Sequence, residues 1–459
     1  MPICVGNSWR CCLAATTNER IHTHRGRNLN IHHSSRQRIA VVGSGISGLA
    51  AAHFLAKRHA VTLFESAPRL GGHTNTVDIE EGGQVFGVDT GFLVFNTRTY
   101  PNLIALFDEL DVVHCESDMS FSVSVGGGAL EWAGTNLRTV FAQPGNLVSA
   151  SFLSMLGDIL RFNRRAHANL EAARRERHSL GELLAAGRYG EPFCAHYLLP
   201  MAAAIWSTPS RDILSFPAET FLRFCLNHGL LQIFNRPRWR TVKGGARSYV
   251  RAIAACLPDI RLATPVQGVR RAATHVDVLT PSGSERYDAV VFATHAPQTL
   301  RMLDDASEDE RAVLGAFRYQ PNTAFLHRDT RLLPRRRSVW SAWNYLDAPL
   351  AGAADSAPCV SYLLNQLQPL PVSTPVVVTL NPTMLPAPEL EYQRFEYEHP
   401  VFDQPAINAQ ARLPALQGQR RTWFAGAWTG YGFHEDGLKS ALRVAGDFNC
   451  APTWAQVTP

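Results

Sequence analysis

A glycine-rich turn near the N-terminus constrains this 459-residue chain more than any other feature. The apolar run IAVV (39–42) is followed directly by GSGISG, which places Gly43, Gly45 and Gly48 in GxGxxG spacing. An apolar helical segment comes next, and a second apolar run, VTLF, leads to Glu65. This order of strand, glycine turn, helix, strand and acidic residue predicts a Rossmann-like βαβ unit.

The chemistry of this unit indicates a dinucleotide site. Gly43 permits the tight turn, Gly45 lets the backbone approach a pyrophosphate, and Gly48 lets the helix pack closely on the strand. The helix start, where Ser47 lies, offers free N–H donors and a positive dipole end. Glu65 follows Gly43 by 22 residues, a position from which its carboxylate can accept hydrogen bonds from both ribose hydroxyls.

The next segments distinguish FAD from NAD. ESAPRLGGHTNTV brings Arg69 and then Gly71 and Gly72, and FGVDTGF brings Gly91 and Phe92. Together with the first motif, this pattern resembles the FAD-dependent superfamily of amine oxidases, phytoene desaturases and protoporphyrinogen oxidases. The resemblance implies that Arg69 lies near the FAD pyrophosphate and that Gly71–Gly72 approaches the cofactor closely. It also implies that the segment of Gly91 and Phe92 runs close to the flavin ring.

Two later segments support the same resemblance. LATPVQGVRR contains Val266, whose backbone reads the adenine edge in the family, and WFAGAWTGYGFHEDGL contains Gly426 and the start of a helix. In the family, backbone amides at this helix start stabilise the negative charge of reduced flavin. The resemblance assigns that role to Gly437 and Leu438. The chain departs from the family at Ala427, where most relatives carry an acidic residue that contacts the cofactor.

These motifs are spread over most of the chain, which predicts a discontinuous cofactor domain. We assign residues 38–104, 236–302 and 406–450 to an FAD-binding domain. Residues 105–235 and 303–405 form an interleaved substrate domain in this interpretation. The expected fold class is α/β with α+β inserts, and the Rossmann-like FAD domain is of the glutathione-reductase-like type.

The net charge of +5 resides in the N-terminal segment. The first 38 residues hold six arginines and one acid, and the remaining 421 residues carry 38 basic and 38 acidic side chains. A body without an overall basic field is not suited to nucleic acid, so we expect no nucleic-acid partner. We interpret residues 1–37 as a disordered leader; a transit peptide and a non-native extension remain open.

The cysteines and the hydropathy pattern limit the cellular compartment in which we expect the protein. No apolar run reaches the ~18 residues of a membrane span. The nine cysteines are widely spaced and include no CxxC pair. This pattern favours a reducing compartment over a disulfide framework or a zinc site. We therefore expect a cytoplasmic protein without a metal site.

An arginine-rich helical segment adds a possible location at a membrane. Residues 146–184 predict long helices, apolar in the first half and rich in arginine in the second. A solvated basic face is one interpretation. Docking on an anionic membrane surface is the other, and it requires an apolar face beside the basic one. Docking of this kind would make the protein peripheral to the membrane.

The predicted substrate domain indicates an apolar substrate. Many amine oxidases hold a lysine near the flavin, whereas neither predicted insert contains a lysine. YLLPMAAAIWSTP and FPAETFLRFCLNHGLLQIFNRPRWRTVKGG are instead rich in apolar and aromatic residues. We therefore expect an FAD-dependent oxidoreductase that takes a hydride from an apolar small molecule, a fatty acyl chain or another lipid chain. An amine oxidase is the alternative.

A narrower resemblance points the same way. AIWS, NHGLL, WRTVKGG and GYGFHEDGL resemble bacterial flavoproteins that are encoded beside cyclopropane-fatty-acid-synthase-type methyltransferases. This resemblance implies a fatty acyl or phospholipid acyl substrate, a desaturation or related oxidation, and a lipid methyltransferase partner. A flavin-binding accessory protein for such a methyltransferase and a redox-neutral isomerase remain alternatives.

Few residues qualify as catalytic candidates. His434 precedes the predicted C-terminal helix, and histidine titrates near neutral pH, which suits acid–base catalysis. Tyr431 and Trp206 are further catalytic candidates, and together with His73 they are expected in the lining of the flavin pocket. The two acids that follow His434 are interpreted as first-turn residues that complement the helix dipole.

Overall fold

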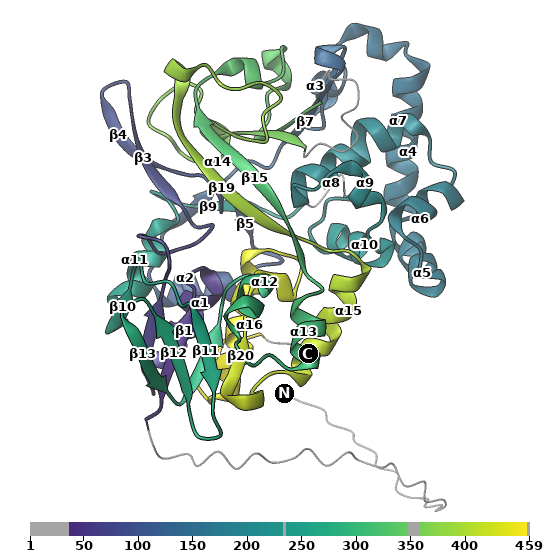
Figure 1. Ribbon diagram of the computed structural model, residues 1–459. Coiled ribbons are helices and arrows are strands. Elements are labelled where there is room, and N and C mark those ends of the chain that lie inside the picture. The colour runs from purple at the N-terminus through teal and green to yellow at the C-terminus, as the bar shows by residue number, and fades with distance from the viewer. Residues whose placement is uncertain (1–35, 233–235, 348–357, 457–459) are drawn as a thin grey trace, which may run out of the picture. The chain divides into compact units, whose positions relative to one another are not determined.

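The computed structural model describes residues 36–232, 236–347 and 358–456. The predicted leader lies almost wholly outside these ranges, so its interpretation stays a prediction. From Gln37 onward the chain forms one compact unit, drawn in Figure 1.

A parallel five-stranded sheet contains the glycine-rich turn. Its strands follow the order β10-β2-β1-β14-β20, and every neighbouring pair is parallel. The strands are β1 (Arg38–Val42), β2 (Ala60–Phe64), β10 (Asp259–Arg261), β14 (Ala289–Phe292) and β20 (Thr422–Phe424). The two apolar runs of the predicted βαβ unit form β1 and β2, as expected for strands that are covered on both faces.

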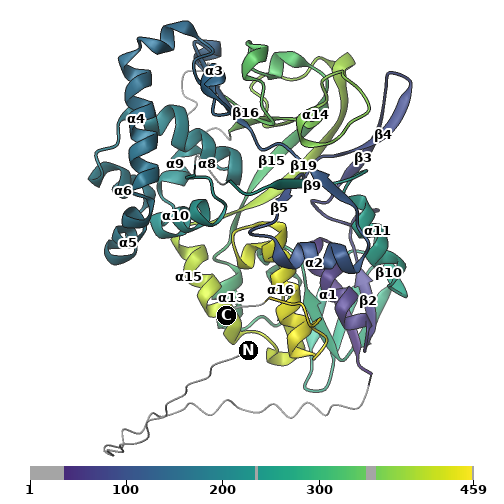
Figure 2. The ribbon, with the colours of Figure 1, turned by 180° about the vertical axis from the view of Figure 1, so that it is seen from behind.

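Helices cover one face of this sheet, as Figure 2 shows. They are α1 (Ile46–Ala56), α2 (Pro101–Glu109), α11 (Arg247–Ala255) and α16 (His434–Asp447). The other face packs against the antiparallel sheet β11 (Gly268–Arg271), β12 (Val276–Thr280) and β13 (Gly283–Tyr287), and against α12 (Ala296–Met302), α13 (Glu308–Leu314) and α15 (Gln404–Arg412). Along β1, Ile39 and Val41 enter the first core, whereas Ala40 and Val42 enter the second.

A second large sheet has seven strands in the order β19-β15-β18-β17-β16-β7-β8. These strands are β7 (Phe121–Val125), β8 (Leu130–Ala133), β15 (Arg318–His327), β16 (Trp343–Leu346), β17 (Cys359–Leu363), β18 (Val377–Leu380) and β19 (Glu391–Val401). All pairs are antiparallel except β16 with β7. The long strands β15 and β19 extend from this sheet toward the helices of the first one (Figure 1).

Shorter elements lie outside the two large sheets. They are the hairpin β3 (Thr76–Glu81) and β4 (Gln84–Asp89), the small sheet β5 (Phe95–Asn96), β9 (Trp239–Val242) and β6 (His114–Glu116), and the short helices α3 (Leu137–Val140) and α14 (Leu364–Leu367). The parallel sheet takes its strands from the segments assigned to the FAD domain, and the seven-stranded sheet takes its strands from the two inserts. Helix α13 belongs to an insert by sequence but packs on the parallel sheet.

The long helices predicted for residues 146–184 are three shorter ones, α4 (Ala150–Arg164), α5 (Ala166–Glu176) and α6 (Leu180–Ala186). The insert continues with α7 (Glu191–Phe193), the π-helix η3 (Cys194–Leu198), α8 (Leu199–Trp206), α9 (Ser210–Leu214) and α10 (Ala218–Asn227). Ser149 and Ser179 cap α4 and α6, which is why new helices begin there. Among the helices that the structure describes, none has the length and apolar composition needed to cross a bilayer.

Candidate functional site

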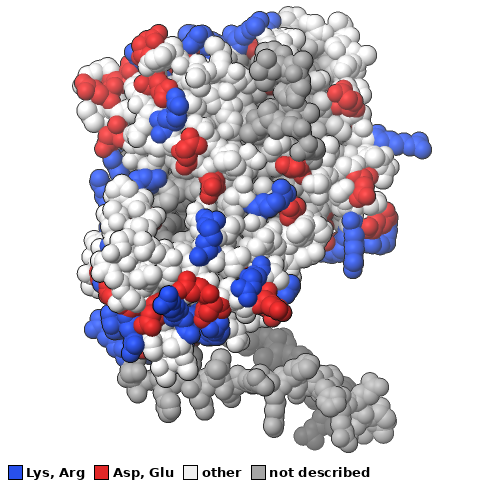
Figure 3. All heavy atoms as spheres, viewed as in Figure 1, with Lys and Arg blue, Asp and Glu red and all other residues white. Residues whose placement is uncertain are grey.

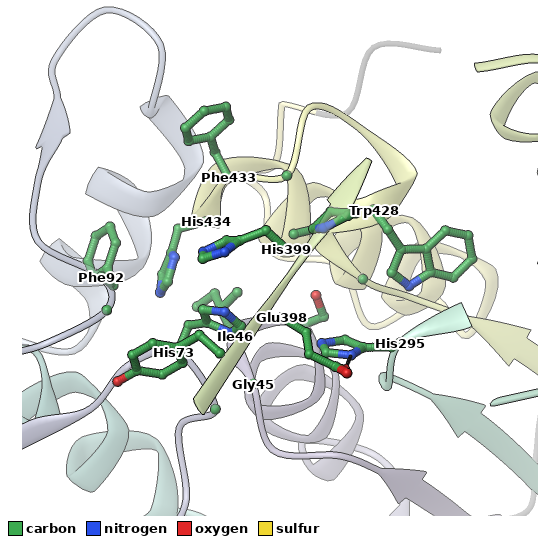
Figure 4. A pocket seen from close by; sticks show the side chains of 18 of the residues that line it. Gly45, Ile46, His73, Phe92, His295, Glu398, His399, Trp428, Phe433 and His434 are labelled. Atoms are coloured by element: carbon green, nitrogen blue, oxygen red, sulfur yellow. Dashed lines mark hydrogen bonds and ion pairs between the residues drawn. The ribbon is translucent and has the colours of Figure 1, made fainter. Parts of the chain in front are cut away.

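A cavity of about 710 Å³ lies where the glycine-rich turn, strand β19 and the start of α16 meet (Figure 4). Its walls come from both large sheets and from the helical insert. The volume falls within the range of roughly 300–1,000 Å³ that is typical of ligand sites.

The glycines of the first motif have three separate steric roles. Gly43 adopts a φ of 97°, a left-handed conformation that side chains disfavour. A Cβ at Gly48 would lie 1.8 Å from the carbonyl oxygen of Gly43, so only glycine lets α1 begin this close to the turn. A Cβ at Gly45 would meet no heavy atom within 4 Å, because this backbone faces the cavity. The turn therefore presents a bare stretch of backbone to a ligand.

Glu65 lies at the same end of the cavity, just after β2. Its Oε2 accepts hydrogen bonds from the hydroxyl of Ser44 and from the Ser44 N–H, the latter over 2.9 Å. Its Oε1 accepts from the N–H of Ala67 over 2.8 Å. These bonds hold the carboxylate in one orientation at the edge of the sheet, where it can accept from the hydroxyls of a bound ligand.

This end of the cavity fits a dinucleotide cofactor. No side chain caps the N-terminus of α1, so the first-turn N–H groups, which include that of Ser47, are available to an anion. The bare backbone at Gly45 leaves room for that anion, and Glu65 suits a ribose. The residues present therefore match the pyrophosphate and ribose of FAD.

The second predicted segment forms another wall of the cavity. Gly71 and Gly72 adopt φ values of 108° and 57°. A Cβ at Gly91 would lie 2.2 Å from the carbonyl oxygen of His73, and the N–H of Phe92 donates to that oxygen over 2.9 Å. The two glycine-containing stretches thus pack back to back, and all five residues line the cavity.

Arg69 is placed differently from the expectation. It is exposed and is not among the lining residues, and its Nη1 donates to the carbonyl of Gly72 over 2.9 Å. In this structure the guanidinium stabilises the turn that carries Gly72, and its predicted contact with a pyrophosphate is not part of the cavity wall.

Val266, Gly426 and Ala427 all line the cavity, as the resemblance implied. Gly426 follows β20, and a Cβ there would lie 2.2 Å from Nε1 of Trp428. The Gly426 N–H donates to the hydroxyl of Ser440 over 2.9 Å, which ties the end of β20 to α16. At Ala427, where most relatives carry an acidic residue, the cavity is therefore lined by a methyl group.

The assignment of Gly437 and Leu438 as amide donors to the flavin is wrong by one helical turn. The Gly437 N–H donates to the carbonyl of Phe433 over 3.0 Å, Leu438 is fully buried, and neither lines the cavity. The N–H groups without helical partners belong to the first turn, which begins at His434. Gly437 has a packing role, because a Cβ there would lie 2.8 Å from both Ile46 and Ser47 of α1.

His434 lines the cavity but is poorly suited to the proposed acid–base role. Its ring stacks on Phe92 with centroids 3.6 Å apart, and its Nε2 lies 2.9 Å from Oγ1 of Thr74 and 3.2 Å from the hydroxyl of Tyr249. Burial lowers the pKa of His434 to about 3. The imidazole is therefore neutral at physiological pH and does not supply a cationic acid, which corrects the expectation.

The structure adds three polar residues that the sequence did not single out, His295, Glu398 and His399. Figure 4 shows His73 and His399 between the pair Phe92–His434 on one side and the pair His295–Glu398 on the other. Nδ1 of His295 lies 3.0 Å from Oε2 of Glu398. Burial lowers the pKa of His399 to about 4.

These histidines do not form a metal site. In residues 36–456, apart from the gaps in the description, no three His, Cys, Asp or Glu side chains are placed to hold a metal ion together. Nε2 of His73 is buried and has no hydrogen-bond partner among the described residues. His73 thus lines the cavity, where we expected it, and its Nε2 is enclosed in the wall without a partner among the described residues.

The part of the lining that comes from α8, α10, β9 and strands β16–β18 is apolar and aromatic, and we call it the apolar wall. Its members are Met119, Ile205, Trp206, Phe224, Leu230, Trp239, Trp343, Tyr362 and Leu380. Trp206 packs on Phe224 with ring centroids 4.7 Å apart, and Tyr431 lies 5.8 Å from the same ring. Trp206 and Tyr431, both predicted candidates, thus line the cavity. Neither side chain is ionised there, because the indole of Trp206 does not titrate and burial raises the pKa of Tyr431.

Comparisons with known proteins identify the family. Residues 46–332 match the model of the flavin containing amine oxidoreductases. Carotenoid phi-ring synthase of Streptomyces griseus is 29% identical over 320 residues, a match that covers 62% of this chain and 58% of that protein. The match therefore spans less than two thirds of that relative.

Solved structures share the fold at low identity. A CLA-producing fatty acid isomerase from P. acnes superimposes with a TM-score of 0.64 and 14% identity, over 90% of this chain and 98% of that one. Putrescine oxidase bound to putrescine gives a TM-score of 0.65 and 16% identity, over 90% and 99%. These likenesses confirm the predicted α/β fold class, and the family match over residues 46–332 confirms the predicted superfamily. The finer glutathione-reductase-like assignment stays a prediction. The chain belongs to the flavin-containing amine oxidoreductase family and is an FAD-dependent oxidoreductase.

Proposed function

We propose that this enzyme oxidises a long apolar substrate, a fatty acyl chain or another lipid chain. FAD supplies the hydride-accepting chemistry when it is bound. The residues of the chain determine which molecule reaches it, and the apolar wall carries the proposal. A lipid methyltransferase that acts on the same acyl chains remains the proposed partner.

The apolar wall contains no Asp, Glu, Lys or Arg among the described lining residues. The charged residues of the cavity, Glu65, Arg301 and Glu398, come from other elements, and Glu398 pairs with His295. His228 lies near the wall, but burial lowers its pKa to about 4, so the ring is neutral. A surface of this kind favours methylene groups, which gain about 0.8 kcal/mol each on burial.

An amine substrate is the second candidate. A buried ammonium group needs a carboxylate or an aromatic face. The wall offers no carboxylate, but the rings of Trp206, Phe224 and Tyr431 favour this alternative because aromatic faces attract cations. None of the three lysines of the chain lines the cavity.

The names of two similar proteins support an apolar substrate, and the name of one supports an amine. A fatty acid isomerase and a carotenoid phi-ring synthase are named for apolar compounds, and putrescine oxidase is named for an amine. Because one of these similar proteins is an isomerase, a redox-neutral reaction on the same class of substrate is a further outcome to be tested.

Anaerobic titration of the flavin-loaded protein tests the proposal. Fatty acids and phospholipids in detergent micelles are compared with putrescine and an aromatic amine, and the visible absorption of the flavin is followed together with product analysis by mass spectrometry. Bleaching by acyl lipids with loss of two hydrogens from the lipid supports the proposal. Bleaching by amines alone overturns it, and a shifted double bond without net bleaching identifies an isomerase.

A further inference from the structure

One region of the surface gathers exposed apolar side chains. Eleven large apolar residues are exposed in the described chain, and five of them lie between residues 137 and 160. These five are Leu137, Leu147, Val148, Leu153 and Leu160, with exposed fractions of 77%, 57%, 85%, 45% and 54%. Scattered exposed apolar residues are ordinary, whereas a cluster of them marks an interaction surface.

The cluster follows from the helical pattern of α4. Phe152 and Met155 are buried against the β7–β8 hairpin. Leu153 and Leu160 are seven residues apart, so they lie two turns apart on one face of the helix, and that face is exposed. Leu147 is the last residue of η2 (Pro144–Leu147), and Val148 follows it and leads into α4, which brings both beside its first turn. Helix α4 is therefore apolar on two faces, and only one of them is covered.

Arginines flank this apolar surface. Arg138, Arg164 and Arg165 are exposed, and they form no ion pair with any residue that the structure describes. Asp158 is the one acid between residues 137 and 165, and it pairs with Arg161 over 2.8 Å. Figure 3 shows acidic and basic side chains intermixed over much of the face that it draws. Unpaired cations beside an apolar face are complementary to an anionic bilayer surface.

A small hollow of about 210 Å³ adjoins the same elements. It is lined by residues of the β7–β8 hairpin, η2 and α4, Asn146 among them, and by Pro192 and His196. Asn146 is only 8% exposed, yet its Nδ2 has no hydrogen-bond acceptor among the described residues. Nδ1 of His196 is likewise buried without a partner in the described chain. A buried polar atom without a partner is uncommon in a folded protein, and two residues of this hollow carry one.

We propose that α3, η2 and α4 form a docking face for an anionic lipid bilayer. The exposed leucines and Val148 enter the acyl region, and Arg138, Arg164 and Arg165 contact lipid phosphates. The docking face is separate from the cofactor cavity. Its test therefore does not depend on which substrate the enzyme oxidises.

Vesicle flotation of the full flavin-loaded chain tests the docking face. Vesicles of phosphatidylcholine alone are compared with vesicles made of equal parts of phosphatidylcholine and phosphatidylglycerol. We expect flotation with the anionic vesicles and its loss at high salt. The variant Leu153→Glu/Leu160→Glu should bind the anionic vesicles about tenfold more weakly or worse, because two apolar side chains leave the acyl region.

Matched variants separate docking from general effects. Leu262→Glu/Leu385→Glu adds the same charges at leucines that are exposed elsewhere, and it should float like the wild type. Unchanged flavin content and thermal midpoint show that each variant is folded. The proposal is overturned if the wild type does not float, or if the control pair loses binding as strongly as the α4 pair.

Charge reversal and solution mass complete the test. Arg164→Glu/Arg165→Glu should abolish the preference for phosphatidylglycerol, whereas Arg443→Glu, on an exposed part of α16, should keep it. Without lipid, the molecular mass in solution is measured by light scattering. A dimer that dissociates on Leu153→Glu/Leu160→Glu would mean that a second copy covers the face, and would overturn the bilayer as its occupant.

Discussion

Nδ2 of Asn322 lies 2.9 Å from Nδ1 of His399, and this contact determines which ring nitrogen carries the proton. The same Nδ2 donates to the carbonyl of Gln320 over 2.9 Å, and Oδ1 of Asn322 accepts from Asn381 over 2.7 Å. The amide orientation follows, because a carbonyl can only accept. Nδ1 of His399 is therefore an acceptor, and the neutral ring carries its proton on Nε2 at the cavity.

Asn322→Asp should reverse this arrangement. A carboxylate beside Nδ1 stabilises the imidazolium, so the pKa of His399, now lowered to about 4 by burial, should rise. Because His399 lines the cavity, we expect the absorption spectrum of the bound flavin to titrate at about pH 5–8 in the variant and to stay constant there in the wild type. The check is a pH titration of both proteins at constant ionic strength.

Asn322→Leu is the matched control for that titration. It removes the hydrogen bond without adding a charge, so it should lower stability and leave the flavin spectrum independent of pH in the same window. If Asn322→Asp and Asn322→Leu give the same pH profile, His399 does not respond to position 322 as the hydrogen bonds require.

Gly45 and Gly48 should respond differently to substitution. Gly45→Glu should yield a folded protein without flavin, because its side chain would enter the space at the helix start and meet no protein atom near its Cβ. Gly48→Ala should destabilise the fold by about 3 kcal/mol or more, since its Cβ would overlap the backbone of Gly43. Flavin content and thermal unfolding of both variants provide the measurement. Flavin retained by Gly45→Glu would refute this placement of the pyrophosphate.

The buried pair of Arg271 and Glu310 should make stability depend on acid. Their side chains are 0% and 3% exposed. Burial alone would raise the pKa of Glu310, but hydrogen bonds from Arg271 and from the Ser307 N–H lower it below the ordinary value of 4.5. Since the folded pKa is depressed, this stabilisation is present above pH 4.5 and is lost as the pH falls through the folded pKa.

Glu310→Gln should therefore cost about 3–5 kcal/mol at neutral pH, because it leaves a buried guanidinium with a weaker set of partners. The difference from the wild type should shrink as the pH falls below 4.5, where Glu310 of the wild type also becomes protonated. Urea unfolding at a series of pH values measures it. A difference that does not vary with pH would show that the ionised pair is not the cause.

Deletion of residues 1–35 should leave flavin content and the thermal midpoint unchanged. The first sheet strand begins at Arg38, and Gln37 already takes part in the fold through its carbonyl, which accepts from the Ala60 N–H over 2.8 Å. Flavin analysis of full-length and shortened protein, purified in parallel, is the measurement. Loss of FAD on truncation would place the predicted leader within the cofactor domain.

Local patterns in the sequence were sufficient for the cofactor end of the cavity. Gly43, Gly45 and Gly48 are needed for steric reasons that act within a few residues of each other, so their spacing already predicts the turn. Glu65 follows from the length of one helix and one strand. The apolar wall was also predictable in character, because its members lie in segments that are aromatic and apolar along their length.

The sequence by itself thus determined the βαβ unit, the family and the character of the substrate region, since short-range periodicity and glycine sterics encode them. Only the tertiary structure decided which groups meet in the cavity. His399 and Glu398 lie on an ordinary-looking strand and reach His73 and His295 only because β19 crosses from one sheet to the other. Which amides of α16 are free also depended on the residue at which that helix begins. Burial, which no local pattern in the sequence predicts, makes His434 neutral.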